Sequence, residues 1–324
     1  MEQTISRGLF LMKTSRKKIF DSLASYMRAG KLPLMICLLP FFINNKQGME
    51  LFRERLDLSI QGTLKRKYYN RLVDTNYQSP MLKKISSDQN IWFMWLQGIE
   101  NAPKLCQTNF LYLQNEFGDA VHLLTAKNIF SYVDIPNFIK DKWSRGIISN
   151  THFSDIIRVQ LLSTYGGTWI DATTFVNSSF LKQLDDFCLP QTFKPGRNGH
   201  AIPVSSWFMN SPKDNTYIKR VRDLLFSYWK TNNRLIDYFL LHHFLIIVSE
   251  EMDHYLDNIY PLDNSMPHYP MLLMKQKVLS ENDFNLFLTT YKVMKFTYKV
   301  ENEIEDTNYN NLIVTMKLWS DYES

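Results

Sequence analysis

The chain contains 324 residues with a formal net charge of +5, and 45% of its residues are apolar and 21% are charged. This is the composition of a folded globular protein, and it excludes a disordered chain, a collagen and a coiled coil. The length allows one large α/β domain with an appendage, or two domains.

Residues 1–86 are predicted to form a mostly helical, basic region, because apolar residues recur three and four positions apart. Residues 1–90 contain 16 Lys and Arg against 7 Asp and Glu, whereas residues 91–324 contain 21 against 25. Two interpretations of this charge stay open, contact with an anionic membrane surface and a solvated helix face. No recognised nucleic-acid-binding motif accompanies the charge, so we expect no nucleic-acid partner.

Signals for export, membrane crossing and disulfide bonding are weak. The longest apolar run, residues 32–43, contains two prolines and is shorter than the ~20 residues of a membrane-spanning helix. The three cysteines lie far apart without metal-ligand spacing, so neither a disulfide framework nor a zinc cluster is predicted. The apolar stretch 9–12 leads into basic residues instead of a cleavage site. We expect a cytoplasmic protein, peripheral on the inner face of the cell membrane where the basic region binds lipid.

Residues 87–324 are predicted to form an α/β domain with a partly parallel sheet. The short apolar runs 91–96 and 121–125 are typical of buried strands, and helices are expected over 103–116 and up to residue 139. The spacing of roughly 30 residues between the two runs matches a βαβ unit. The boundary near residue 87 rests on the change in charge and periodicity.

The segment 149–177 is predicted to fold as a helix, a turn and a strand. Ser, Asn and Thr at 149–151 are suited to cap the helix, Gly166-Gly167 to end it, and the β-branched and aromatic residues 168–176 to form the strand. Asp155 and Arg158 lie three residues apart on one side of this otherwise apolar helix. They either pair only with each other or bind a ligand.

Asp171 is an unusual charge within the apolar stretch that follows the two glycines. Ligands of open α/β sheets bind outside the carboxyl ends of the strands, where a carboxylate can contact a sugar hydroxyl or a metal-bound phosphate. A cap or bulge contact is the alternative. Asp155, Arg158, Gly166-Gly167 and Asp171 in one ordered segment form a more specific pattern than any of them alone.

The residues Ser154–Arg158 (SDIIR) and Tyr165–Thr173 (YGGTWIDAT) resemble the signature of bacterial capsular polysaccharide synthesis glycosyltransferases. That family is related to glycosyltransferase family 32 and, more distantly, to clostridial glucosylating toxins. The resemblance extends over about residues 90–300 and includes Met94–Gly98, Asp237–Phe239 and Lys295–Lys299. It implies a GT-A fold, a Rossmann-like α/β sandwich that binds a nucleotide sugar, and sugar transfer with retention of anomeric configuration.

The resemblance also implies roles for individual residues. Trp95, or Trp92 in its place, would stack on the nucleotide base, while a core position is the alternative for either tryptophan. Asp155 and Arg158 would orient the donor sugar and diphosphate, with Arg158 donating planar, charge-assisted hydrogen bonds. Asp171 would be the first acid of the family's DXD motif, near the sugar and a metal ion.

The remaining site residues include one departure from the family pattern. Gly167, Thr173 and Lys299 are assigned to the donor site, but Thr173 stands where the second acid of the DXD motif is expected. A divalent cation, Mn²⁺ or Mg²⁺, would then be held by the diphosphate and Asp171, so metal dependence is open. His268 is either a further metal ligand or a loop residue. Asp237, near the start of an apolar helix, either binds substrate hydroxyls or caps that helix.

The function implied is transfer of a hexose from a nucleotide sugar, UDP-linked, to a lipid-linked oligosaccharide of a capsule or surface polysaccharide. In a front-face retaining mechanism the departing phosphate takes the acceptor proton, so no side-chain nucleophile is required. Two alternatives stay open. One is a non-catalytic nucleotide-sugar-binding assembly subunit, and the other is a transferase that acts on protein hydroxyls.

Overall fold

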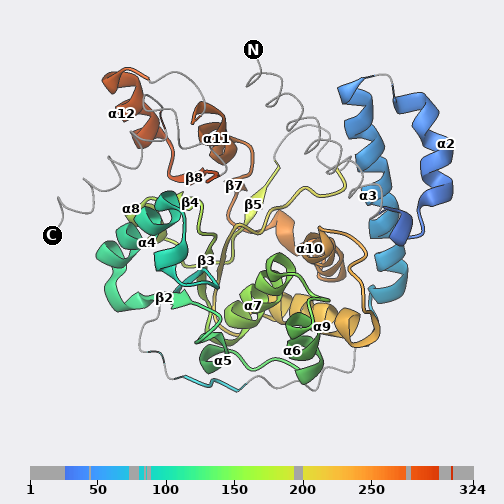
Figure 1. The fold of residues 1–324 in the computed structure, drawn as a ribbon, viewed down its shortest axis with the longest axis horizontal. Coiled ribbons are helices and arrows are strands. Elements are labelled where there is room, and N and C mark those ends of the chain that lie inside the picture. Colours follow the sequence, from blue (N-terminus) through green and yellow to red (C-terminus); the bar gives the residue numbers. More distant parts are fainter. Residues whose placement is uncertain are drawn as a thin grey trace, which may run out of the picture.

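The computed structural model describes residues 26–43, 45–72, 80–83, 85, 89–192, 200–274, 279–298 and 308. Its centre is a four-stranded sheet in the order β2-β1-β3-β6, with helices on both faces (Figure 1). The strands are β1 (Ile91–Met94), β2 (Val121–Leu124), β3 (Gly167–Ile170) and β6 (Phe208–Ser211). The predicted α/β class is thereby confirmed, while the narrower GT-A assignment stays a prediction.

The directions in which the strands pair determine which strand ends lie together. β1 is parallel to both β2 and β3, in the register Ile91↔Val121 and Ile91↔Thr168, and β6 is antiparallel to β3. The carboxyl ends of β1, β2 and β3 and the amino end of β6 therefore lie at one edge of the sheet. β1 and β2 confirm the strands that were predicted over residues 91–96 and 121–125.

Two apolar layers separate the sheet from its helices, because side chains alternate along a strand. Trp92, Trp169 and Met209 face a core that they share with α7 (Asn150–Tyr165), α9 (Thr216–Thr231) and α10 (Leu240–Glu251). The side chains of Ile91, Phe93, Ile170 and Phe208 face the other core, with α4 (Lys104–Phe117) and α8 (Ser178–Leu181). Figure 1 shows α7, α9 and α10 on one side of β3, and α4 and α8 on the other.

The shorter elements complete the fold. The remaining helices are α5 (Ile129–Tyr132), α6 (Asn137–Ser144), α11 (Tyr269–Leu273) and α12 (Glu281–Thr290). Short 3₁₀ turns lie at Ile99–Asn101, Gly118–Ala120, Tyr255–Asp257 and Met266–His268. Two small sheets flank the central one: β4 (Thr174–Val176) pairs antiparallel with β8 (Val293–Lys295), and β5 (Pro190–Gln191) pairs parallel with β7 (Leu262–Asp263).

The single strand expected over residues 168–176 is wrong, because a turn divides it into β3 and β4. The backbone N–H of Asp171 donates to the Trp207 carbonyl (2.9 Å), and that of Thr174 donates to the Asp171 carbonyl (2.8 Å). The turn takes the chain from the central sheet to β8, and Asp171 lies directly after the end of β3.

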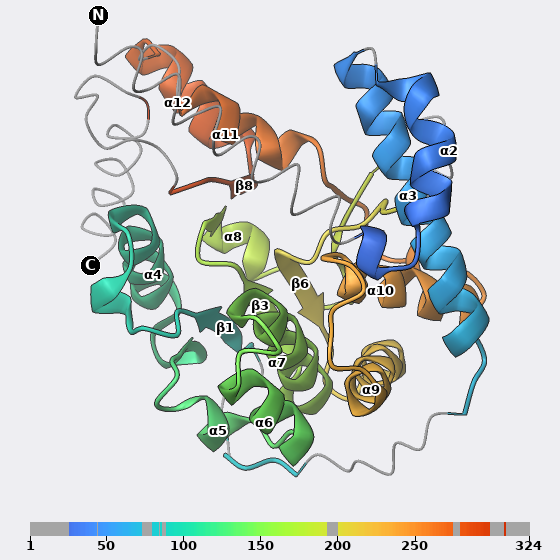
Figure 2. The same ribbon diagram turned by 45° about the vertical axis from the view of Figure 1, so that its right-hand side comes forward.

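The helices predicted in residues 1–86 are confirmed where the structure describes that region. α2 (Leu32–Phe42) and α3 (Lys46–Tyr68) lie side by side next to α10 (Figure 2). One face of α3 belongs to the same apolar core as α7, α9 and α10, and the Tyr68 ring meets Phe244 of α10 edge-on at 5.2 Å. The domain boundary near residue 87 stays a prediction.

Candidate active site

The polar edge of the central sheet brings together residues from four strands. Asp171 follows β3, Trp95 follows β1, Ser206 and Trp207 precede β6, and Lys295 ends β8. β6 runs against β3, so its amino end lies at the same edge as the carboxyl end of β3. This is the edge at which open α/β sheets bind ligands.

Asp171 is the centre of this group. Its Oδ1 accepts hydrogen bonds from Arg158 Nη2 and Trp169 Nε1, both at 2.9 Å, and its Oδ2 accepts one from Lys295 Nζ at 3.2 Å. Burial acts to raise the pKa of Asp171, but the charges of Lys295 and Arg158 and these hydrogen bonds outweigh it. The pKa of Asp171 therefore lies below its usual value, and the carboxylate is ionised at neutral pH.

Arg158 joins two carboxylates on the inner side of this edge. It is 3% exposed, and its Nη1 lies 3.3 Å from Asp155 Oδ1, while its guanidinium also covers the Trp169 ring at 4.7 Å. Ser206 Oγ accepts a further hydrogen bond from Nη1. The local Asp155–Arg158 pair therefore exists, but Arg158 also binds Asp171, so the pairing is more than local.

Lys295 is one site residue that was not assigned a role from the sequence. Its ammonium group donates to Thr173 Oγ1 at 2.9 Å and reaches Thr174 Oγ1 at 3.4 Å, in addition to Asp171. The antiparallel pairing of β4 with β8 places Lys295 opposite Thr174. The one signal in the sequence was its position at the start of the Lys295–Lys299 stretch. Lys299, which was predicted to bind the donor, lies outside the described residues.

The two candidate tryptophans differ sharply. Trp92 is 0% exposed, and its Nε1 donates to the Gly166 carbonyl at 2.8 Å. Its ring lies in the core against His122 at 4.7 Å, so the substitute role for Trp92 in base stacking is wrong. Trp95, beyond the end of β1, is partly exposed and meets the Tyr298 ring edge-on at 5.9 Å. Within the described residues its Nε1 has no hydrogen-bond partner.

Gly167 has a packing role instead of the predicted donor contact. It begins β3, at the edge of the sheet opposite to Asp171, and has a φ of +91°. A Cβ at this position would lie 2.2 Å from the Asn90 carbonyl oxygen. Glycine is therefore required by the close approach of β3 to the chain before β1.

Asp237 is buried at 5% exposure, three residues before the start of α10. Its Oδ2 accepts from the Phe239 backbone N–H (3.0 Å) and lies 3.2 Å from His243 Nε2. The N-cap position of α10 is Phe239, so the helix-cap alternative is wrong, and the binding of substrate hydroxyls by Asp237 stays a prediction. Its neighbour Tyr238 is 62% exposed instead.

Tyr238 and His242 were not identified from the sequence. Desolvation of its hydroxyl group, followed by the charges of Asp155 and Asp171, raises the pKa of Tyr238. Burial lowers the pKa of His242 to about 4, which leaves this ring neutral at pH 7. The charges of Asp155 and Arg158 contribute to the pKa shifts of both residues.

His268 lies at the rim of the site. Its Nδ1 is 2.7 Å from the Asn264 carbonyl oxygen, and its ring meets Trp207 edge-on at 5.6 Å. In the described part of the chain, no three His, Cys, Asp or Glu side chains converge as a metal site would require. The structure thus gives His268 a packing contact, and its role as a metal ligand stays a prediction.

A second buried carboxyl group, Asp57 of α3, lies away from the sheet edge and is hydrogen-bonded to Tyr26. Asp57 is 9% exposed and accepts a hydrogen bond from the Tyr26 hydroxyl at 3.0 Å. Burial and then the charge of Asp237 raise the pKa of Asp57 to about 7. Between about pH 4 and pH 7 the folded protein therefore holds a proton that the unfolded chain releases. This contribution to stability is present at low pH and is lost as the pH rises through 7.

We expect Asp57→Asn to remove the loss of stability at high pH, because the amide stays neutral and still accepts a hydrogen bond from Tyr26. At pH 8 the variant should exceed the wild type in free energy of unfolding by roughly 2–4 kcal/mol, with little difference near pH 4. Urea denaturation of both proteins across this range measures the effect, with the exposed Asp119→Asn as control. Parallel pH curves for Asp57→Asn and the wild type would refute the shifted pKa.

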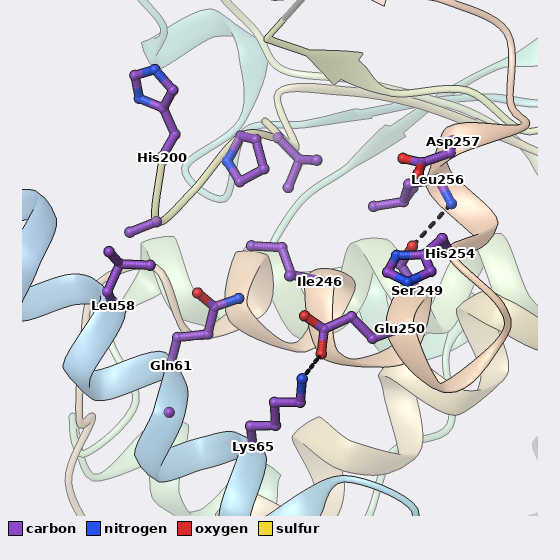
Figure 3. Close-up of a pocket in the computed structure, with 14 residues that line it drawn as sticks. Leu58, Gln61, Lys65, His200, Ile246, Ser249, Glu250, His254, Leu256 and Asp257 are labelled. Atoms are coloured by element: carbon purple, nitrogen blue, oxygen red, sulfur yellow. Dashed lines mark hydrogen bonds and ion pairs between the residues drawn. The ribbon is translucent and has the colours of Figure 1, made fainter. Parts of the chain in front are cut away.

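A cavity of about 500 Å³ lies apart from this edge, between α3 and α10 (Figure 3). Leu58, Gln61 and Lys65 line it from α3, and Glu250 of α10 pairs with Lys65 across it. None of the predicted site residues lines this cavity. The candidate active site is therefore the Asp171 edge.

The sequence was compared with known proteins. A family profile described as "Capsular polysaccharide synthesis protein" matches residues 42–313. The chain is 28% identical over 167 residues to O-glycosyltransferase braB of Annulohypoxylon truncatum, covering 45% of this chain and 38% of that protein. It is 25% identical over 168 residues to O-glycosyltransferase PaGT of Phomopsis amygdali, covering 47% and 41%.

A third relative, glycosyltransferase afumC of Aspergillus fumigatus, is 27% identical over 140 residues, which are 37% of this chain and 33% of the relative. The chain thus spans well under half the length of the curated relatives it matches. These relatives are fungal, and the predicted bacterial origin and the link to glycosyltransferase family 32 stay predictions. The family profile covers most of the chain, and the chain belongs to the capsular polysaccharide synthesis protein family.

Proposed function

We propose that the protein is a glycosyltransferase that binds a nucleotide sugar at the Asp171 edge and transfers the sugar to a hydroxyl oxygen. The observation that carries the proposal is Asp171 held between the cations of Arg158 and Lys295. A carboxylate suits sugar hydroxyls, and two cations suit a diphosphate. The names of the relatives, which are O-glycosyltransferases, support an oxygen acceptor.

The proposed reaction exchanges one bond for another at the anomeric carbon. The bond from this carbon to the diphosphate oxygen breaks, and the acceptor oxygen forms the new bond. The acceptor proton passes to the departing diphosphate, and the configuration is retained. Arg158 and Lys295 stabilise the negative charge that grows on the leaving group, which is the electrostatic term that often dominates such catalysis.

The proposed donor is a UDP-hexose whose base stacks on Trp95. We expect Trp95→Ala to weaken UDP binding by about 10- to 100-fold, since stacking of a base on an aromatic ring is worth ~1–3 kcal/mol. Isothermal titration with UDP measures this change. Trp143→Ala is the matched control, because Trp143 stacks on Phe153 of α7 instead of lying at the sheet edge. Equal affinities for both variants would contradict the role of Trp95.

The proposed acceptor is a lipid-linked oligosaccharide, presented at an anionic membrane surface. α2 exposes Ile36 and Phe41 at 64% and 77%, its C-cap residue Ile43 is 59% exposed, and the last turn of α3 is basic. Among the described helices, none has the length and apolar character needed to cross a bilayer. Flotation with phosphatidylglycerol vesicles tests this contact, and no recovery with the vesicles would argue against it.

A thermal-shift panel of nucleotide sugars, followed by nucleotide-release assays, tests the proposed activity. Ligands that bind only the native state raise the melting temperature by mass action. A selective shift by one sugar nucleotide with release supports the transferase. A shift without release or transfer favours the non-catalytic binding subunit, and sugar transferred to protein instead of lipid-linked acceptor favours the third alternative.

A further inference from the structure

The oxygens near Asp171 make a poor site for a resident divalent cation. Both Asp171 oxygens already accept hydrogen bonds from cationic or N–H donors, and the next oxygens are the neutral hydroxyls of Thr173 and Thr174. Mn²⁺ and Mg²⁺ prefer carboxylate and phosphate oxygens. Within the described residues, no further acidic or imidazole groups join Asp171 in a cluster able to hold a metal. The metal expected from the family resemblance does not fit this donor set.

A positively charged side chain nevertheless lies beside Asp171. The Lys295 ammonium lies 3.2 Å from Asp171 Oδ2, 2.9 Å from Thr173 Oγ1 and 3.4 Å from Thr174 Oγ1. Three oxygens match the three N–H donors of an ammonium group. The Lys295 side chain is 15% exposed and that of Asp171 is 32% exposed, so both border solvent.

A metal-bound pair of acids and the Lys295–Asp171 pair have the same formal charge. A divalent cation between two carboxylates sums to zero, and one ammonium beside one carboxylate also sums to zero. Thr173 in place of an acid, together with Lys295, is therefore a charge-matched alternative to a metal-bound acid pair. In the protein without a bound donor, a divalent cation added to Asp171 and Lys295 would give the three groups a formal charge of about +2, which Coulomb repulsion disfavours.

We propose that the Lys295 ammonium takes the place of the divalent cation, so that the protein binds the diphosphate of its sugar nucleotide without a metal. This inference rests on the proposed function. The contact with Thr174 is the longest of the three, and a diphosphate oxygen replaces it when the donor binds. Arg158 supplies the second cation from the inner side of Asp171.

Isothermal titration of wild-type protein tests the proposal directly. We expect UDP to bind in EDTA with a Kd within about threefold of that in excess MnCl₂, and MnCl₂ alone to give no binding heat. A loss of more than about tenfold in EDTA would overturn the inference while leaving the proposed function intact. Absence of UDP binding in both buffers, together with no release from any sugar nucleotide, would overturn the proposed function first.

Variants distinguish the ammonium from a merely structural lysine. We expect Lys295→Met to weaken metal-free UDP binding by more than about tenfold, Lys295→Arg to retain it, and the exposed Lys292→Met to leave it unchanged. Thr173→Asp combined with Lys295→Met restores two acids, and its UDP binding should tighten by about tenfold or more on addition of MnCl₂. Thermal melts confirm that each variant is folded. Unchanged binding by a folded Lys295→Met would refute the proposal, and the wild-type titration decides the case for a variant that does not fold.

Discussion

Asp171→Asn lowers the rate of nucleotide release by about 10²–10³-fold or more, which is the size of effect seen when one group of an electrostatic site is removed. The amide has nearly the same volume as the carboxylate, and its oxygen still accepts from Arg158 and Trp169. Its NH₂ group cannot accept from Lys295, and the negative charge between the two cations is lost. The expected result is a folded protein with little activity.

Steady-state release of nucleotide and a thermal melt measure the two parts of this prediction. Asp141→Asn is the matched control, because Asp141 forms an exposed ion pair with Arg145 and belongs to α6 instead of the sheet edge. Turnover equal to that of the wild type, with an unchanged melting temperature, would contradict the role of Asp171. An inactive protein that also melts far below the wild type would indicate a structural defect instead.

Arg158→Met lowers the free energy of unfolding by about 3–5 kcal/mol, because it leaves two carboxylates without their shared cation. Asp155 is 8% exposed, and among the described residues its other side-chain contact of this kind is His152 Nδ1 at 3.5 Å. Asp171 keeps Lys295 on its other oxygen, so most of the loss is expected to come from Asp155. Activity is lost as well, because the diphosphate loses one of its two cations.

Urea denaturation at pH 7 measures the effect. Arg145→Met breaks the exposed pair with Asp141 and should cost no more than about 1 kcal/mol. Asp155→Asn combined with Arg158→Met removes the unpaired charge, so it should regain part of the stability that Arg158→Met loses. If Arg158→Met lowers the free energy of unfolding by less than about 1 kcal/mol, then water, and not Arg158, stabilises the charges of these carboxylates.

The individual helices and strands were predictable because each depends on residues close together in the sequence. Ser149 does cap α7, as expected, by accepting from the His152 backbone N–H, and the helix ends at Gly166 with a φ of +70°. The apolar runs before Trp95 and at 121–125 form strands for the same local reason. The two tryptophans were not separated by sequence, because both lie within the predicted run 91–96, whereas β1 ends at Met94 and leaves Trp95 outside the strand.

The site was only partly predictable because its contacts join distant segments. Lys295 and Asp171 are 124 residues apart, and the β4–β8 pairing that joins them has no signature within either segment. Gly167 was predicted at the turn after the helix, whereas it is the first residue of β3, and its need for glycine comes from Asn90, far earlier in the chain. Asp237 was singled out, although the exposed neighbour that feels the site charges is Tyr238.

The order in which the ribosome makes the strands adds a consequence of the β4–β8 pairing. β3 and Asp171 leave the ribosome long before β8, and at ~5–20 residues per second the 124 residues between Asp171 and Lys295 take roughly 6–25 s to synthesise. During this interval Arg158 and Trp169, two of the partners of Asp171, are already synthesised, but Lys295 is not. The pair of cations proposed to bind the diphosphate is therefore complete only late in translation, after the strands of the central sheet have been made.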